Sequence, residues 1–215
     1  MNEVIKLICP RCRHQFDFTL HTGIYLNEEP ELRDKIKDLS LFRFVCPDCG
    51  FSIPVEYPCS VVDKAHDVLL FSVPVADRTK EEYAEFIAGA SRNVDYSNGC
   101  IYRFVNCKEA LAEKLSIFDN NYDDRAIELY KLKYYFVWRN EYPKMTSAYF
   151  LDDSKGFNLN IFADQDIIAT IPLDPKEYQD IVTKYFFDSK VRGQKLKIVN
   201  QEWAEEYLEK FEKVS

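Results

Sequence analysis

The sequence is poor in glycine and contains no long apolar run. It has six glycines among 215 residues, and none of them lies in a phosphate-binding loop, so a nucleotide-cradling site is not expected. No stretch approaches the ~20 apolar residues that a membrane-spanning helix needs, and no basic leader precedes an apolar segment at the N-terminus. Nucleophile-elbow and metalloprotease motifs are also missing. We therefore expect a cytoplasmic protein with no membrane segment.

The sequence also has fewer basic than acidic residues. The chain has 28 Lys and Arg against 36 Asp and Glu, which gives a net charge of −8. Nucleic-acid binders gain most of their affinity by neutralising phosphates, so this balance argues against a general DNA or RNA binder. A local basic region remains at the N-terminus, made of Lys6, Arg11, Arg13, Arg33, Lys35 and Lys37.

The first sixty residues have the pattern of short strands interrupted by one helix. Apolar residues alternate with polar ones over 16–20, 42–46 and 51–57, which is the period of a half-buried strand. Pro30 can begin a short helix that extends to Leu39, because its apolar residues share one face. This region is therefore predicted to form antiparallel hairpins with a helical insertion.

The rest of the chain mixes both kinds of element. Thr79 and Glu82 have the spacing of a capping box, and Asn200 is placed to cap the last helix. Strands are predicted over 68–73, 100–105, 157–161 and 167–171, and helices from Thr79, over 108–118, over 123–138, from Asp174 and from Asn200. The prediction is an α+β protein with an N-terminal region over 1–107 and a C-terminal α+β region over 108–215, or one compact unit.

Two cysteine pairs are the most informative motif. They are Cys9-Pro10-Arg11-Cys12 and Cys46-Pro47-Asp48-Cys49, and they account for four of the seven cysteines. An odd cysteine number with close pairs is more typical of metal binding in a reducing compartment than of disulfides. Two such turns at hairpin tips can supply the four thiolates of a tetrahedral Zn²⁺ site, which would be closed and structural. Gly50 follows the second pair, where a positive φ is often needed, whereas Arg13 follows the first.

The cysteine pairs and their neighbours also allow other interpretations. A lone Cys-Pro-x-Cys can be a redox site when its first thiol lies at a helix N-terminus, but strand-like sequence follows both pairs. His14 lies close enough to the first pair to replace one cysteine ligand. Cys59, Cys100 and Cys107 lie beside apolar residues and are interpreted as buried structural thiols.

Two further groups of polar residues have a functional and a structural interpretation. Asp123, Asp124, Arg125 and Glu128 could form a ligand site or an acid–base pair, but acidic residues also favour the start of a helix, here with Asn121 as the cap. We favour the helix start. His66 followed by Asp67 could be an acid–base pair, but no nucleophile stands beside them, and a solvated turn is preferred.

The chain resembles a known family over about its first 130 residues. Two Cys-Pro-x-Cys pairs, the second within Phe44-Val45-Cys46-Pro47-Asp48-Cys49-Gly50-Phe51, are similar to the CpXC domain of bacterial and archaeal proteins. The stretches 109–118 and 123–128 also resemble proteins of this type. The resemblance implies a prokaryotic protein in which Cys9, Cys12, Cys46 and Cys49 are the defining residues. It implies no activity, because the family has no assigned function.

These observations lead to one functional hypothesis and two alternatives. The first is a non-enzymatic zinc-ribbon protein that binds a protein partner, since the predicted metal site is closed and no catalytic motif is recognised. The second is a zinc ribbon that binds nucleic acid through the N-terminal basic region and aromatic stacking. The third is a thiol redox enzyme that uses one Cys-Pro-x-Cys pair.

Overall fold

The computed structural model describes residues 2–75, 79–92, 99–153, 156–164, 166–185 and 198–213. These residues form two compact units, 2–112 and 113–213, and the boundary between the units falls within helix α3 (Lys108–Asp119). The predicted division after residue 107 stays a prediction. Among the described residues, no helix has both the length and the apolar character needed to cross a membrane.

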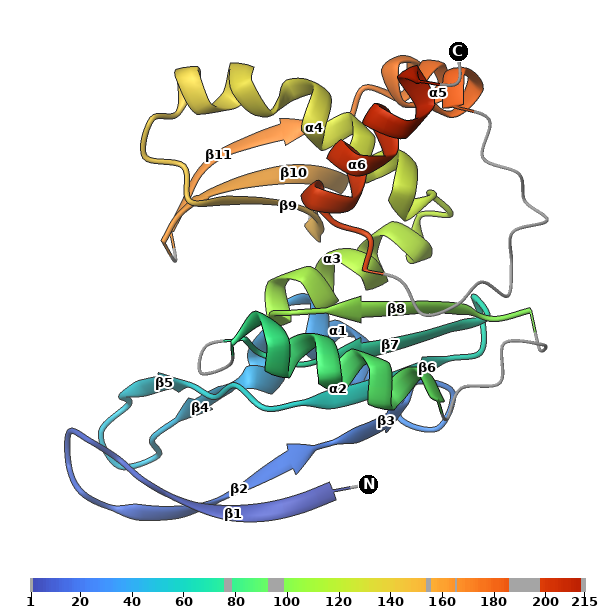
Figure 1. Cartoon of the computed structure of the whole chain (residues 1–215). Helices are drawn as coiled ribbons and strands as arrows, with labels where there is room; N and C mark the ends of the chain where they lie inside the picture. The colour runs from blue at the N-terminus through green and yellow to red at the C-terminus, as the bar shows by residue number, and fades with distance from the viewer. Residues whose placement is uncertain are drawn as a thin grey trace. The chain divides into compact units, whose positions relative to one another are not determined.

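The N-terminal unit contains two hairpins and a separate sheet (Figure 1). Its elements are β1 (Asn2–Ile8), β2 (Gln15–His21), β3 (Gly23–Tyr25), α1 (Glu31–Lys37), the 3₁₀ helix η1 (Ser40–Phe42), β4 (Arg43–Val45), β5 (Ser52–Pro54), β6 (Cys59–Asp63), β7 (Val68–Ser72), α2 (Lys80–Arg92) and β8 (Ile101–Val105), followed by the start of α3.

Each of the two hairpins consists of two antiparallel strands, and its connecting turn contains one cysteine pair. Ile8 lies opposite Gln15 at the end of the β1–β2 ladder, and Val45 lies opposite Ser52 at the end of β4–β5. Strand β3 and helices α1 and η1 lie between the hairpins in the sequence. This confirms the predicted α+β class with N-terminal hairpins and a helical insertion.

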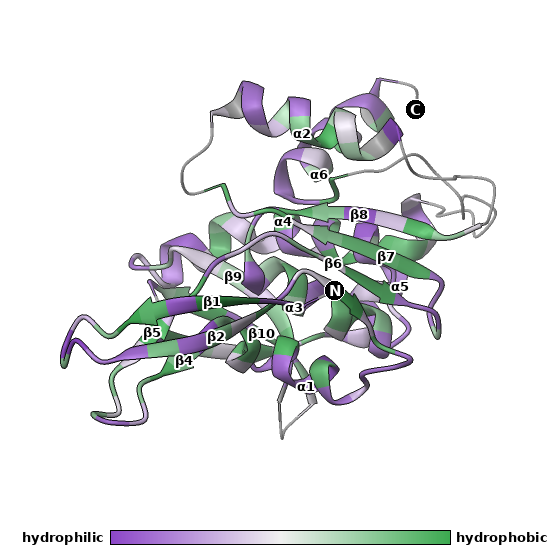
Figure 2. Cartoon of the chain, turned by 90° about the horizontal axis from the view of Figure 1, so that it is seen from below, coloured by the Kyte–Doolittle hydropathy of each residue, from purple (hydrophilic) through white to green (hydrophobic). Residues whose placement is uncertain are grey.

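The four-stranded sheet of this unit has the order β3-β6-β7-β8. Strand β6 runs parallel to β3 and antiparallel to β7, and β8 runs parallel to β7. Strand β7 is mostly hydrophobic along its length (Figure 2), as expected for an interior strand. Before α2, Thr79 and Glu82 form the predicted capping box, because each backbone N–H donates to the other residue's side chain.

The C-terminal unit is a three-stranded antiparallel sheet with helices. The sheet order is β11-β10-β9, so three consecutive strands form a meander. Its elements are the remainder of α3, then α4 (Asp124–Glu141), β9 (Ser147–Asp153), β10 (Gly156–Ala163), β11 (Asp166–Pro172), α5 (Pro175–Tyr185) and α6 (Gln201–Glu212).

The core of the C-terminal unit lies between the helices and one face of this sheet. Ile127 and Tyr130 of α4 belong to the same buried cluster as Phe150, Leu159 and Ile161 of the sheet. Aromatic rings extend this cluster, as in the edge-to-face contact of Tyr130 with Phe150, whose centroids are 5.8 Å apart. The C-terminal unit therefore has a hydrophobic core of its own.

Helix caps confirm one sequence prediction and correct another. Asn200 caps α6 as expected, because its side chain accepts a hydrogen bond from the backbone N–H of Trp203. The cap of α4 is Asp123 and not Asn121, since Asp123 Oδ1 accepts from the N–H of Arg125. Asn121 instead has a φ of +57°, a left-handed conformation that asparagine tolerates in a turn.

Candidate metal centre

The two cysteine turns have the same local backbone structure. In the first turn, the N–H of Arg13 donates to the carbonyl of Cys9, and the N–H of Cys9 donates to His14. In the second, the N–H of Gly50 donates to the carbonyl of Cys46, and the N–H of Cys46 donates to Phe51. All four hydrogen bonds are 2.9 Å long. Both Cys-Pro-x-Cys sequences therefore fold into one type of tight turn, each between two antiparallel strands.

The residue after each pair adopts a left-handed backbone conformation. Gly50 has a φ of +70° and Arg13 a φ of +65°. Glycine adopts such angles without strain, whereas a residue with a Cβ pays about 1–2 kcal/mol. The second turn thus has the residue that its geometry favours, and the first turn keeps the same geometry with an arginine.

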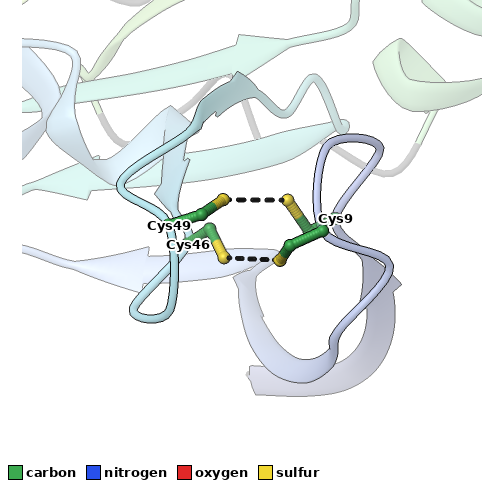
Figure 3. A group of neighbouring side chains, drawn as sticks. Cys9, Cys46 and Cys49 are labelled. Atoms are coloured by element: carbon green, nitrogen blue, oxygen red, sulfur yellow. Dashed lines mark hydrogen bonds between the residues drawn. The ribbon is translucent and has the colours of Figure 1, made fainter.

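The turns bring the four cysteine side chains of the two hairpins together (Figure 3). The Sγ atoms of Cys9 and Cys49 are 3.6 Å apart, and so are those of Cys12 and Cys46. All four sulfurs lie within 4.8 Å of one another. A tetrahedral metal with bonds of about 2.3 Å to sulfur holds its ligands about 3.8 Å apart. The four cysteines are therefore placed so that they could bind one metal ion.

The thiols influence one another strongly. Burial opposes ionisation of Cys9, but hydrogen bonds from the backbone N–H groups of Cys12 and Arg11 outweigh it and lower the pKa of Cys9 to about 6. A hydrogen bond from the His14 backbone favours ionisation of Cys12, but burial and the neighbouring thiols outweigh it and raise the pKa of this thiol to about 12. Four thiolates at this spacing would repel one another, so the fully ionised set requires a cation among them.

The cysteines belong to the small core that joins the hairpins. Cys9 and Cys46 are buried with Phe44, and Phe44 packs against Phe16 and Phe18 of the other hairpin. The partly buried members of this cluster are Leu7, Phe16, Phe18, Cys49, Ile53 and Val55. Few apolar side chains are available here, and small domains with limited cores commonly rely on a metal for stability.

His14 does not join the cysteine cluster. Its ring stacks on Phe16 with centroids 4.4 Å apart, and its Nδ1 contacts the carboxylate of Asp48 in the other turn. Within the described part of the chain, the metal-ligating group at the hairpin tips consists of the four cysteines. The alternative of His14 as a ligand is therefore not supported, and His14 instead links the two turns through Asp48.

The three remaining cysteines differ from one another. Cys59 is buried, as predicted, and burial raises the pKa of its thiol to about 12. Cys100 and Cys107 are only half-buried, so the prediction of buried thiols is wrong for them. The sulfur of Cys107 accepts a hydrogen bond from the N–H of Ala110 at the start of α3, which gives this thiol a capping role.

His66 contacts Asp63 and not the neighbouring Asp67. Its Nδ1 lies 2.7 Å from Asp63 Oδ2, while Arg33 contacts Asp63 Oδ1 at 2.9 Å. Asp67, the neighbour in sequence, has a φ of +53° in the turn between β6 and β7. Burial opposes ionisation of Asp63, but hydrogen bonds from His66 and Arg33 outweigh it and lower the pKa of this carboxyl. His66 therefore contacts the buried carboxylate of Asp63, so the alternative of a His66–Asp67 acid–base pair is not supported.

The four charged residues at the start of α4 separate into two groups. Asp123 caps the helix and forms two charged hydrogen bonds with Arg125, to Nε and to Nη2. Asp124 and Glu128 are buried and lie 3.0 and 3.4 Å from Lys114 of α3. The helix-start interpretation therefore holds for Asp123, Asp124 and Arg125, but it does not account for the buried pairing of Asp124 and Glu128 with Lys114.

Asp124 and Glu128 belong to a buried ionic network that the sequence interpretation missed. The network consists of Glu113, Lys114, Asp124, Glu128 and Lys131. Lys131 contacts Glu113 at 3.0 Å, and Glu113 also accepts the backbone N–H of Phe150 on β9 at 2.7 Å. Burial raises the pKa of Glu113. The spacing of Asp124, Glu128 and Lys131 along one helix face is the signal that could have revealed the network.

Comparison with known proteins identifies the family of this chain. No curated protein and no solved structure matches the chain. A family model described as "CpXC protein" matches residues 7–131, which is more than half of the sequence and contains both cysteine pairs, α3 and the first part of α4. The chain therefore belongs to the CpXC protein family.

Proposed function

We propose that Cys9, Cys12, Cys46 and Cys49 bind one structural Zn²⁺ ion, and that the protein is a non-enzymatic, cytoplasmic zinc-ribbon module that binds a protein partner. The supporting observation is that two hairpin tips place four sulfurs within 4.8 Å of one another. Four thiolates in a tetrahedral set are typical of structural zinc. The set also fills the coordination sphere, so that no position is left for a reacting water.

In this proposal the ion joins two hairpins that share few apolar contacts. Each hairpin by itself is a two-stranded ribbon, and such ribbons are at best marginally stable in water. A metal that binds both turns stabilises their relative position through the folding free energy supplied by its binding. In this proposal the ion therefore holds the ends of the two hairpins in place as a binding surface and takes no part in a reaction.

Exposed apolar side chains beside the cysteines support a role in protein binding. Ile8 is 59% exposed and Val45 55% exposed, and each is the last residue of a strand and directly precedes a Cys-Pro-x-Cys sequence. Phe51, which follows the second turn, is 38% exposed. Apolar residues gathered at one end of a structure commonly mark an interaction surface.

The metal is tested by elemental analysis of the purified protein and of a Cys46→Ser variant. One zinc per chain is expected in the wild type, and loss of zinc with lower thermal stability is expected in the variant. Cys59→Ser is the matched control, because Cys59 is equally buried but lies outside the cluster, and it should keep its zinc. Iron in place of zinc, or no metal at all, would contradict the proposal.

The interaction surface is tested by affinity purification of tagged protein from its own cells. An Ile8→Asp/Val45→Asp variant should lose any partner that the wild type retains, while its zinc content stays the same. Ile167→Asp is the control, because Ile167 is 56% exposed but lies on β11 of the C-terminal unit. Equal retention of the partner by both variants would show that the hairpin end is not the binding surface.

The two alternatives have weaker support. Arg11 and Arg13 are exposed in the first turn, which favours nucleic-acid binding locally, although the net charge of −8 opposes it. Salt-dependent binding of single-stranded DNA at low ionic strength would support this alternative. A redox role is favoured when the first thiol lies at a helix N-terminus, whereas both cysteine pairs occupy turns between antiparallel strands.

A further inference from the structure

The sulfurs of the cysteine cluster face one another across the hairpins as two pairs (Figure 3). Cys9 lies 3.6 Å from Cys49, and Cys12 lies 3.6 Å from Cys46. Each pair contains one cysteine from each hairpin. A disulfide has a bond of about 2.05 Å, so the two sulfurs of either pair must approach by about 1.5 Å to form one.

Each of these pairs also combines an accessible sulfur with a buried one. Cys12 is exposed and Cys49 is half-buried, whereas their partners Cys46 and Cys9 are buried. An oxidant that approaches from solvent therefore meets Cys12 and Cys49 first. The buried partner lies behind each of them at 3.6 Å, which is the arrangement of an attacked cysteine and a resolving cysteine.

We propose that the metal site is regulated by oxidation, in which a hydroperoxide converts the cluster into two disulfides between the hairpins, Cys12–Cys46 and Cys9–Cys49, and releases the ion. The inference rests on the proposed zinc site. It assigns a different pairing from a thiol redox enzyme, in which Cys9 would join Cys12 and Cys46 would join Cys49 within their own turns.

The reaction uses one peroxide for each disulfide. Cys12, which would be a thiolate while it binds the ion, attacks the O–O bond. A bond between its sulfur and one oxygen forms, the O–O bond breaks, and the leaving hydroxide takes a proton, so that water and a sulfenic acid result. The thiolate of Cys46 then attacks the Cys12 sulfur, so that the S–S bond forms, the S–O bond breaks, and a second hydroxide leaves as water. The two sulfurs lose two electrons, the peroxide gains two, and Zn²⁺ leaves with its oxidation state unchanged. Cys49 and Cys9 react in the same way.

The pairing determines what happens to the proposed interaction surface. Disulfides across the hairpins would keep the two turns together after the ion leaves, so Ile8 and Val45 would stay close to their original positions. Disulfides within each turn would leave the hairpins without a covalent or metal link. The structure therefore favours a switch between a metal-joined and a disulfide-joined form over a switch that releases the hairpins.

The experiment treats the zinc-loaded, full-length protein with hydrogen peroxide and follows zinc release with a chromophoric chelator. Free thiols should fall from seven to three per chain as the four cluster cysteines pair. The pairs are then mapped by mass spectrometry without reduction. Trypsin cleaves after Arg11, Asp-N before Asp48 and chymotrypsin after Phe51, which places the four cysteines and Cys59 on separate peptides.

Peptides joined as Cys9–Cys49 and Cys12–Cys46 support the inference. Pairs within each turn, or zinc release with sulfinic acids and no disulfide, overturn it. A Cys12→Ser variant gives a second readout that does not depend on bound zinc: reduced protein should form Cys9–Cys49 and leave Cys46 as a thiol, whereas Cys46–Cys49 would contradict the pairing. The zinc content before oxidation tests the proposed function separately, so either idea can fail without the other.

Discussion

Replacement of Lys114 by methionine should strongly destabilise the C-terminal unit. Lys114 is 2% exposed and lies 3.0 Å from Asp124 and 3.4 Å from Glu128, both of which are also buried. Methionine fills most of the same volume, so the main effect is the loss of a cation beside two carboxylates. Removal of one member of a buried ionic group typically costs about 3–5 kcal/mol, because the remaining charges keep their desolvation penalty.

The chain offers a natural probe for this measurement. Its two tryptophans, Trp138 and Trp203, both lie in the C-terminal unit, so urea unfolding followed by tryptophan fluorescence reports on that unit. We expect the free energy of unfolding to fall by about 3–5 kcal/mol in Lys114→Met. Lys210→Met is the control, because Lys210 is 76% exposed in its pair with Glu206 and should change stability by less than about 1 kcal/mol.

A double variant separates charge from packing. Lys114→Met/Asp124→Asn removes one charge of each sign, so it should recover part of the stability that Lys114→Met loses. A loss below about 1 kcal/mol in Lys114→Met, or no recovery in the double variant, would refute the reasoning that the buried network depends on charge balance.

Two further predictions concern the N-terminal unit. Arg13→Gly should raise the free energy of unfolding of the zinc-loaded protein by about 0.5–1 kcal/mol, because it relieves a φ of +65°. Gly50→Ala should lower it by about 1 kcal/mol, since an added Cβ would meet no atom and the cost is conformational alone. In thermal unfolding, a less stable Arg13→Gly or a more stable Gly50→Ala would contradict the equivalence of the two turns. Asp63 should add stability that is fully present above its ordinary pKa of 3.8 and is lost as the pH falls through its lowered pKa. In Asp63→Asn, acid unfolding followed by circular dichroism should no longer show this loss. An unchanged dependence of stability on pH in this variant would rule out Asp63 as the source.

The cluster of four cysteines could be predicted from the sequence because its signal is local and repeated. Each Cys-Pro-x-Cys turn specifies its own geometry, and alternating residues on both sides predict the strands that carry it. Arg13 shows the limit of this reasoning: a residue disfavoured at positive φ still occupies the position equivalent to Gly50. The tertiary structure of the turn overrides the preference of that one residue.

The buried network and strand β9 could not be predicted in the same way. Glu113 and Lys114 lie in a helix that also contains Lys108, Glu109 and Asp119, and charged residues in a helix are normally assigned to its solvent face. Only the position of α4 and β9 buries them. Strand β9 has three apolar residues in succession, Tyr149 to Leu151, without alternation, so its pairing with β10 decides its conformation.

The family match ends at Lys131, and this position has a practical consequence for the design of expression fragments. The matched segment, residues 7–131, ends within α4, whose residues Ile127 and Tyr130 pack against β9 and β10. A fragment trimmed to the matched segment would expose this apolar face and the carboxylates of the network to water. The segment that matches the family and a segment that can fold by itself therefore end at different residues. An expression fragment that includes α4 must continue through the sheet that covers it.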